Sequence, residues 1–344
     1  MSAVKKIGLF GCGTVGRGLV ELLRDKRDWL EDKYGFLFEL CLISDYLKGT
    51  VKSPHGLNPD EVLKNLAEKG DLFSMGSASS KRFTPDELIG SLQLDIVCDA
   101  TPTNYETGQP SLGILRAALS SGACAVTSSK GGVGFDLAGL EKLAQGNGVK
   151  LRYESSVLSG TPLLNLTRDA LAGCEISRAE GIVNGTTNYI LTMMESGASY
   201  ASALTEAQRL GYAEANPAGD VEGFDAAVKV CIMAQAFFGV KISVGEVKRV
   251  GITGVTPEDI KKAASEGRRV KLIAGVKREE GGITGYVGPQ AIDITHPLAG
   301  VMGAANAVCL TTDNLGDVTI VGPGAGARET AQGMLADMLE IARG

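Results

Sequence analysis

The N-terminal end of the chain carries the pattern that constrains its fold most strongly. A short apolar run, Val4 to Phe10, leads directly into Gly11-Cys12-Gly13-Thr14-Val15-Gly16, and a helical pattern of leucines follows. In such a turn the first glycine permits the tight bend, the second lets a pyrophosphate approach the backbone, and the third lets helix and strand pack closely. The first N–H groups of the helix then face the phosphates. The pattern predicts a dinucleotide-binding domain, and a glycine-rich turn without a ligand is the alternative.

The end of the second expected strand bears on the choice of dinucleotide. This strand runs from Phe38 to Ser44 and ends at Asp45. An acid at this place holds the ribose hydroxyls of the adenosine and favours NAD. Lys48 and Lys52 are close enough along the chain to meet the 2′-phosphate of NADP instead. The residues therefore leave both cofactors open.

Two later strands end in polar turns. Leu94 to Ala100 leads into Thr101-Pro102-Thr103-Asn104, and Ala123 to Thr127 leads into a turn that contains Lys130. Open α/β sheets bind their ligands at the carboxyl ends of parallel strands. These turns are therefore candidates to line the cofactor crevice, although a solvated loop lysine is the more ordinary interpretation of Lys130.

The whole pattern predicts an α/β protein whose residues 1–150 form a Rossmann domain. The other elements expected in this part are helices at Leu57–Glu68, Pro85–Leu92 and Leu112–Ser121 and a strand at Val149–Tyr153.

Beyond Pro162 the pattern changes, and we expect residues 151–321 to form an α+β domain for catalysis and dimerisation. Its expected elements are helices at Leu163–Leu171 and Asn188–Glu195 and strands at Ile176–Val183, Arg269–Val276, Ile283–Val287, Ala307–Thr312 and Val318–Val321. The short β runs indicate an open, mostly antiparallel sheet with helices on one face. Residues 322–344 are expected to return a helix, Glu329 to Ala342, to the dinucleotide-binding domain.

A polar pair stands at the start of an apolar helix in this second part. Asp225 and Lys229 are four residues apart, so they share a helix face, and Val230 to Phe238 is apolar on nearly every side. A helix that is hydrophobic all round is buried. We therefore expect the pair at the buried or cleft-lining start of a core helix, where a lysine can exchange protons. A solvated surface pair is the alternative.

Composition excludes several classes of protein. The chain has 344 residues, a net charge of −6 and a pI near 5.2, which argues against a nucleic-acid surface. Its seven cysteines form no C-x-x-C spacing, so neither a zinc site nor a disulfide framework is indicated. No signal peptide or apolar run of transmembrane length is present. We expect a soluble cytoplasmic protein.

Longer motifs identify a family that the chain resembles. They are Thr101-Pro102-Thr103-Asn104, Thr107-Gly108-Gln109-Pro110, Gly181 to Leu191 (GIVNGTTNYIL), Gly211 to Lys229 (GYAEANPAGDVEGFDAAVK), His296-Pro297-Leu298-Ala299 and the glycine-rich turn at Gly322. Together they resemble the homoserine dehydrogenases of the short, single-function kind over essentially the whole chain. In one departure, Asn216 stands where the family often has an acid.

The resemblance implies catalytic and substrate roles for particular residues. Lys229 would be the general acid/base, and Asp225 would orient substrate or water beside it. The implied substrate-binding residues are Glu214 for the amino group, Asp220 in support of the pocket, Gly185 and Thr186 for the amino-acid end, and Lys130, which touches cofactor and substrate.

The implied binding sites for small ligands combine the motif with the resemblance. The cofactor would be lined by Gly11, Gly13, Thr14, Val15, Gly16, Asp45, Thr101, Pro102, Lys130 and Gly326. The resemblance also implies a monovalent cation such as Na⁺, held mainly by backbone carbonyls, at Glu154, Val157, Ser159 and Thr161.

The resemblance further implies the reaction and the assembly. The reaction would be the NAD(P)-dependent interconversion of L-aspartate 4-semialdehyde and L-homoserine, in threonine, methionine and isoleucine biosynthesis, by a homodimer. Because the chain ends at Gly344 and begins with the glycine motif, we expect neither a C-terminal regulatory domain nor a fused aspartate kinase.

Three other functions are weighed against this one. A histidine-based 2-hydroxy-acid dehydrogenase needs a cleft histidine, and only His55 and His296 exist, each next to a proline. A phosphorylating semialdehyde dehydrogenase needs a nucleophilic cysteine with a nearby base, which the sequence does not indicate. A non-catalytic dinucleotide sensor would keep the glycine motif without needing the Asp225/Lys229 pair.

Overall fold

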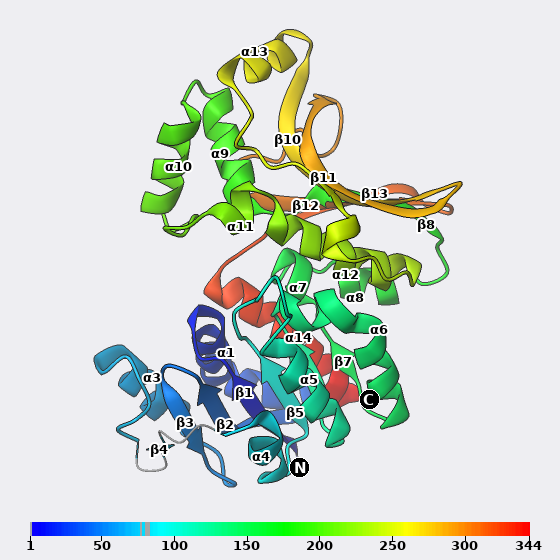
Figure 1. Cartoon of the computed structure of the whole chain (residues 1–344). Coiled ribbons are helices and arrows are strands. Elements are labelled where there is room, and N and C mark those ends of the chain that lie inside the picture. Colours follow the sequence, from blue (N-terminus) through cyan, green and yellow to red (C-terminus); the bar gives the residue numbers. More distant parts are fainter. Residues whose placement is uncertain (1, 76–77, 80–82) are drawn as a thin grey trace. The chain divides into compact units, whose positions relative to one another are not determined.

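The computed structural model describes residues 2–75, 78–79 and 83–344, and the chain divides into two compact units. The first comprises Met1–Gly160 and Gly326–Gly344, and the second Thr161–Ala325. Each unit is built on a sheet of its own (Figure 1). Within the described ranges, no helix is both long enough and apolar enough to cross a bilayer.

The first unit is a doubly wound α/β structure with strand order β4-β3-β2-β1-β5-β6-β7. Its elements are β1 (Ala3–Phe10), α1 (Thr14–Asp25), α2 (Arg27–Tyr34), β2 (Phe36–Asp45), β3 (Gly49–Lys52), α3 (Pro59–Glu68), β4 (Ala78–Ser79), α4 (Pro85–Gly90), β5 (Ile96–Asp99), α5 (Ser111–Ser120), β6 (Cys124–Thr127), α6 (Lys130–Gly146), β7 (Leu151–Arg152), α7 (Ser155–Leu158) and α14 (Ala327–Arg343). β1 pairs in parallel with β2 and with β5. The strand order turns at β1, which opens a crevice at the carboxyl ends of these strands. The predicted Rossmann architecture is confirmed.

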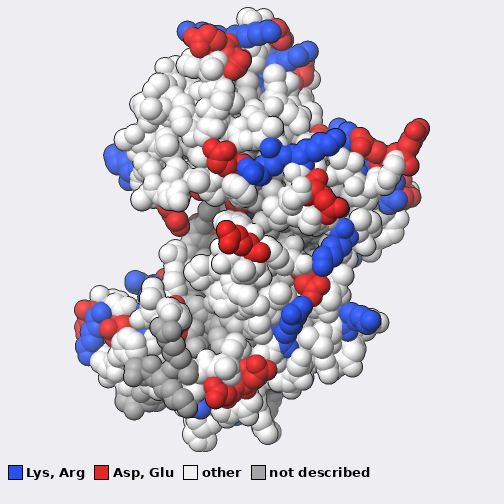
Figure 2. Space-filling model, in the orientation of Figure 1, with Lys and Arg blue, Asp and Glu red and all other residues white. Residues whose placement is uncertain are grey.

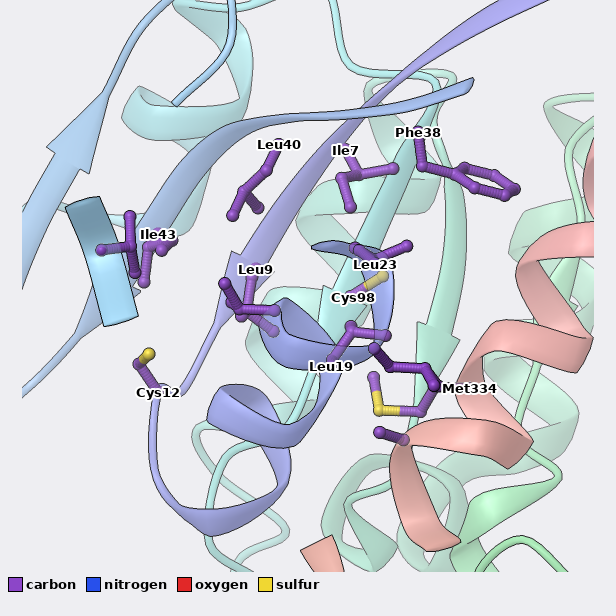
Figure 3. Packing of buried hydrophobic residues seen from close by; sticks show 14 of the residues in the cluster. Ile7, Leu9, Cys12, Leu19, Leu23, Phe38, Leu40, Ile43, Cys98 and Met334 are labelled. Carbon is purple, nitrogen blue, oxygen red and sulfur yellow. The ribbon is translucent and has the colours of Figure 1, made fainter. Parts of the chain in front are cut away.

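The core of the first unit lies between β1, β2, α1 and α14. Figure 3 shows Ile7 and Leu9 of β1 directed toward Leu19 and Leu23 of α1, with Met334 of α14 beside them. All five side chains are buried, and the apolar face of an amphipathic helix is stabilised mainly by such burial. The helix next to the C-terminus is therefore part of the dinucleotide-binding unit's core.

Several elements of the first unit differ from the expectation. The helices α2 and α6 and the antiparallel strands β3 and β4, of which β4 is at the sheet edge, were not predicted. Lys130 is the first residue of α6 and does not lie in a loop. This helix begins Lys130-Gly131-Gly132 and has a non-helical Asp136 (φ −149°, ψ 46°), so its apolar period is interrupted.

The second unit has a six-stranded sheet of order β13-β12-β8-β10-β11-β9. Its elements are α8 (Leu164–Asp169), β8 (Ile176–Ile182), α9 (Gly185–Glu195), α10 (Tyr200–Arg209), α11 (Ala218–Val221), α12 (Phe224–Phe238), the 3₁₀ turn η1 (Val244–Glu246), β9 (Lys248–Arg249), α13 (Pro257–Ser265), β10 (Arg268–Glu279), β11 (Gly282–Asp293), β12 (Ala305–Thr312) and β13 (Gly316–Pro323). Every pairing is antiparallel except that of β9 with β11. The predicted mostly antiparallel sheet is confirmed.

The central helix of the second unit is α12, which packs against β8, β10 and β11. Every residue from Asp225 to Ala234 is buried, as the apolar pattern predicted. The helices α10 and α13 were not predicted, because small and charged residues dilute their apolar periods.

Candidate active site

The polar pair at the start of α12 is buried. Lys229 Nζ lies 2.8 Å from Asp225 Oδ2, and each residue is only 5% exposed. Lys229 Nζ also donates a hydrogen bond of 2.5 Å to the carbonyl oxygen of Val183, which directly follows β8. The surface interpretation of the pair is therefore wrong. A buried ion pair contributes little net stability after desolvation, so its retention here points to a chemical use.

Asn184 completes this cluster and was not predicted as a site residue. Its side-chain carbonyl caps α9 by accepting a hydrogen bond from Thr187 N at 2.9 Å. Its amide Nδ2 donates to Asp220 Oδ1 at 2.7 Å and to Asp225 Oδ2 at 3.0 Å. One N-cap side chain thus joins both acids, and Asn-Gly directly after an apolar strand was the signal that could have identified it.

The residues expected to hold the amino-acid end of a substrate lie at the start of α9, next to Asn184. Gly185 and Thr186 open α9, and Thr186 Oγ1 donates to Tyr212 O at 2.6 Å, which ties α9 to the 211–217 turn. Glu214 is exposed in that turn. Within the described residues, no hydrogen bond joins the Glu214 carboxylate to the buried cluster.

The glycine turn of the first unit has the form that the motif predicts. Gly11 has φ +83°, and a Cβ there would lie 2.6 Å from Ala100 O. A Cβ on Gly16 would collide with Gly11 O, whereas a Cβ on Gly13 would meet nothing within 4 Å. The α1 helix has no side-chain cap and no acid in its first turn. Its first N–H groups therefore suit an anion that approaches over Gly13.

Asp45 is anchored to the glycine turn. Its Oδ2 accepts from Cys12 N at 2.7 Å, and its Oδ1 accepts from Leu47 N and Lys48 N at 2.9 and 3.0 Å. Lys48 Nζ donates to Cys12 O at 2.6 Å, whereas Lys52 Nζ donates to Ser91 Oγ at 3.0 Å. Of the two lysines proposed near a 2′-phosphate, Lys48 therefore bonds to the glycine turn and Lys52 bonds elsewhere.

A cavity of about 950 Å³ opens in the first unit at the carboxyl ends of its strands. It is lined by apolar rings and by polar turn residues, which suits a planar heterocycle with a ribose. The lining includes the candidate cofactor residues Asp45, Thr101 and Pro102, and its other members are Phe10, Ser44, Tyr46, Gly49, Thr50, Phe73, Ser79, Phe83, Pro85, Thr103, Asn104, Gln109, Pro110 and Ile114.

The remaining candidate cofactor residues belong to the same unit. Thr14 and Val15 form the first turn of α1, and Gly326, with φ +131°, precedes α14. Lys130 N donates to Thr103 Oγ1 at 3.3 Å, so the start of α6 is tied to a turn that lines the cavity.

The candidate cation residues follow β7. Glu154 and Val157 are buried, and Glu154 N donates to Asp337 Oδ2 at 2.9 Å. Ser159 has φ 58°, and its hydroxyl bonds Thr330 Oγ1 at 2.7 Å. Thr161, the first residue of the second unit, donates to Pro323 O at 2.9 Å. Over the described ranges, no group of three or more His, Cys, Asp or Glu side chains forms a metal site.

A glycine turn at the switch point of a parallel sheet, together with a buried lysine–aspartate pair in a second unit, defines a dinucleotide-dependent oxidoreductase. Comparison with known sequences narrows this class. Residues 162–339 match the profile of the family described as homoserine dehydrogenase. The chain belongs to the homoserine dehydrogenase family.

Individual relatives align along nearly their full length. The NAD(+)-dependent homoserine dehydrogenase of Pseudomonas canavaninivorans is 39% identical over 98% of this chain and 96% of its own length. The homoserine dehydrogenase of Methanocaldococcus jannaschii is 35% identical over 97% of each chain. A hyperthermophilic archaeal homoserine dehydrogenase in complex with NADPH has a TM-score of 0.85 and 30% identity, covering 99% of this chain and 98% of its own.

Proposed function

We propose that this protein interconverts L-aspartate 4-semialdehyde and L-homoserine with a nicotinamide dinucleotide. The buried Asp225–Lys229 pair, held by Asn184, is the observation that carries the proposal. NAD(P)H supplies hydride to the aldehyde carbon when bound. Lys229 gives a proton to the nascent alkoxide, which yields the alcohol. In the opposite direction a neutral Lys229 removes the hydroxyl proton, so homoserine oxidation should become faster as the pH rises.

The residues around Lys229 have supporting roles in this proposal. Asp225 orients the substrate or a water, and Asp220 supports the pocket through the shared amide of Asn184. Glu214 holds the substrate amino group, and the first turn of α9 at Gly185 and Thr186 receives the amino-acid end. Lys130 contacts cofactor and substrate.

The cofactor is proposed to lie in the cavity of the first unit. Its pyrophosphate would approach over Gly13 toward the first N–H groups of α1, at Thr14 and Val15. Gly11 and Gly16 allow this turn its close packing. Thr101, Pro102, Lys130 and Gly326 contribute the remaining contacts.

We propose a preference for NAD over NADP. Three backbone N–H groups fix the Asp45 carboxylate, which would accept ribose hydroxyls and repel a 2′-phosphate. Lys48 is the residue that opposes this preference, although its amine already bonds to Cys12 O. A relative described as NAD(+)-dependent supports NAD, whereas a structural relative was solved with NADPH.

The chemistry of the cysteines and histidines disfavours the alternative dehydrogenases. Burial raises the pKa of Cys12 and of Cys231 to about 12, so these thiols are protonated at neutral pH and are poor nucleophiles. His55 is exposed, and His296 Nε2 lies 3.6 Å from Glu180 Oε1. Neither histidine has the lysine–aspartate setting that the proposed proton transfer uses.

A monovalent cation is proposed at the turn that contains Glu154, Val157 and Ser159, with Thr161 next along the chain. Burial of the first three residues and the positive φ of Ser159 support the proposal, because backbone carbonyl oxygens are ligands that hard cations accept. A rise in melting temperature with NaCl, measured against choline chloride, would support the site.

We further propose a cytoplasmic homodimer that acts on a small molecule. All seven cysteines are free, which suits a reducing compartment. Acidic and basic side chains are mixed on the face in Figure 2, which suits neither nucleic acid nor an anionic membrane. Val321 of the edge strand β13 and Leu315 in the turn before it are 57% and 61% exposed, so this unit offers apolar surface to a second copy.

Initial rates with L-homoserine and either NAD or NADP test the function. We expect NAD(P)H formation at 340 nm, a higher kcat/KM with NAD, and trapping of the aldehyde product by a hydrazine reagent. L-Serine, which is one methylene shorter, is the matched control substrate. Binding of NADH without homoserine turnover would overturn the substrate assignment and leave the dinucleotide-binding fold intact.

A further inference from the structure

The carboxylate of Asp99 is the most deeply enclosed charge near the cofactor cavity. Asp99 ends β5 and is 0% exposed. Among the described residues, no lysine or arginine pairs with it. A buried charge without a counter-ion is unfavourable unless hydrogen bonds compensate it. The donors that bond to Asp99 therefore indicate which parts of the structure it holds.

Four hydrogen bonds compensate this charge. Asp99 Oδ1 accepts from Thr101 N at 3.0 Å and from Thr101 Oγ1 at 2.6 Å. Its Oδ2 accepts from Ser111 Oγ at 2.5 Å and from Thr127 Oγ1 at 2.8 Å. Burial nevertheless raises the pKa of this carboxyl above its ordinary value, with the hydroxyl donors acting to lower it.

Each donor belongs to a segment that forms or supports the cavity wall. Thr101 begins the 101–104 turn, which lines the cavity, and Ser111 directly follows the lining residues Gln109 and Pro110. Thr127 Oγ1 accepts from Ser129 N at 3.0 Å, and Ser129 caps α6, the helix that begins at Lys130. One carboxylate therefore fixes three segments that come from separate parts of the chain.

The position of Asp99 in the sheet indicates which half of the cofactor depends on it. In a doubly wound sheet the adenosine lies toward the end of the strand that carries the ribose-binding acid, here β2 with Asp45. The nicotinamide half must then extend to the other side of β1, over the end of β5.

We propose, on the basis of the proposed function, that Asp99 is a positioning residue for the nicotinamide half of the cofactor site. It touches neither the reacting atoms nor the substrate. Its carboxylate holds the 101–104 turn and the start of α6 in one geometry, and it thereby places Thr101 and Lys130.

Asp99→Asn tests the proposal because it preserves the volume and removes the charge. The variant should bind NADH on the order of tenfold more weakly, the size expected when hydrogen bonds to a charged group are lost. Its kcat should also fall by about tenfold to a hundredfold, because small misplacements of reacting groups slow hydride transfer strongly. NADH binding is measured by fluorescence titration, so this result stands even if homoserine is not the substrate.

Asp95→Asn is the matched control. Asp95 lies four residues earlier, just before β5, and accepts a backbone hydrogen bond from Lys6 N at 2.7 Å at the opposite end of the strand. Its amide variant should keep the parent's NADH affinity and kcat. If Asp99→Asn lowers only the melting temperature and keeps both values, Asp99 is merely structural and the proposal is wrong.

A second variant keeps the proposal testable if Asp99→Asn fails to fold. Thr127→Val preserves shape and the Asp99 charge but disconnects the carboxylate from Ser129 and the start of α6. It should lower kcat at least about tenfold, as a misplaced cleft group would, with a smaller change in NADH affinity. A parent-like kcat in Thr127→Val would overturn the proposal.

Discussion

At the scale of single residues, the second unit concentrates its polar chemistry on a few buried side chains. Asn184 is an N-cap and also a bridge between two acids. Lys229 bonds to Asp225 and to the last carbonyl before Asn184. The side chain of Asn184 therefore stabilises a helix and also contacts the candidate catalytic acids. Mutations can test the two roles separately.

Asn184→Ala should affect stability and catalysis together. Loss of an N-cap lowers the free energy of unfolding by about 1 kcal/mol. Loss of the amide also removes its hydrogen bonds to Asp220 and Asp225. We therefore expect kcat for homoserine oxidation to fall at least about tenfold, the size expected when hydrogen bonds to charged groups are lost. Ser199→Ala is the control, because Ser199 caps α10 through Ser202 N and contacts no acid of the cluster. Equal kcat in both variants would contradict the bridging role.

Lys271 provides a prediction that is independent of catalysis. It is 0% exposed, and its Nζ donates to Val301 O at 2.6 Å and Asn188 Oδ1 at 3.1 Å. Burial lowers its pKa from 10.5 to about 8. Between these values only the unfolded chain holds the proton, so raising the pH favours the folded chain.

Relative to Lys271→Met, the parent should therefore gain stability as the pH rises. The difference in free energy of unfolding should shift by roughly 2–3 kcal/mol in the parent's favour between pH 7 and pH 10. Urea unfolding of both proteins at several pH values measures this shift. A difference that does not change with pH would show that the buried amine does not titrate in this range.

At the scale of elements, α14 is held in the first unit by its core face and by an ion cluster. Glu340 of α14 accepts hydrogen bonds from Lys150 Nζ at 3.0 Å and from Arg152 Nη2 at 2.9 Å, beside β7. Partial burial opposes ionisation, but these donors outweigh it and lower the pKa of Glu340 to about 2. The last helix is thus tied to the edge of the parallel sheet.

Glu340→Gln should weaken this attachment in a pH-dependent way. The folded-state pKa lies below the ordinary 4.5, so the stabilisation is present above pH 4.5 and is lost as the pH falls toward 2. Allowing for partial exposure, the variant should lose about 1–2 kcal/mol at pH 7. Urea unfolding at pH 7 and pH 3 measures it, with the exposed Asp169→Asn as control. A loss that is as large at pH 3 as at pH 7 would contradict the electrostatic explanation.

The elements also show what sequence patterns can predict. Regularly spaced or continuous apolar residues identified β1, β8 and α12, because an element that is buried on one face or on all faces carries apolar residues at the buried positions. The helix α6 was missed, since glycines and the irregular Asp136 interrupt its period. Two-residue strands such as β4 leave no pattern at all.

At the scale of the whole molecule, sequence patterns predicted a Rossmann unit and a mostly antiparallel second sheet. They also predicted that Asp225 and Lys229 are buried together. The contacts of Asn184 and Asp99 could not be read from patterns, because their partners are up to 41 and 28 residues away along the chain. Such contacts depend on tertiary packing, which the local spacing of apolar residues does not reveal.

Replacement of Lys229 by alanine tests the central claim most directly. Homoserine oxidation and NADH binding would be measured for the parent, for Lys229→Ala and for Lys261→Ala, which removes an exposed lysine of the same unit. The proposed general acid/base role predicts a kcat lower by about a hundredfold or more in Lys229→Ala, with NADH affinity unchanged and Lys261→Ala like the parent. Normal turnover by Lys229→Ala would contradict the role and would make the buried pair a structural feature of α12.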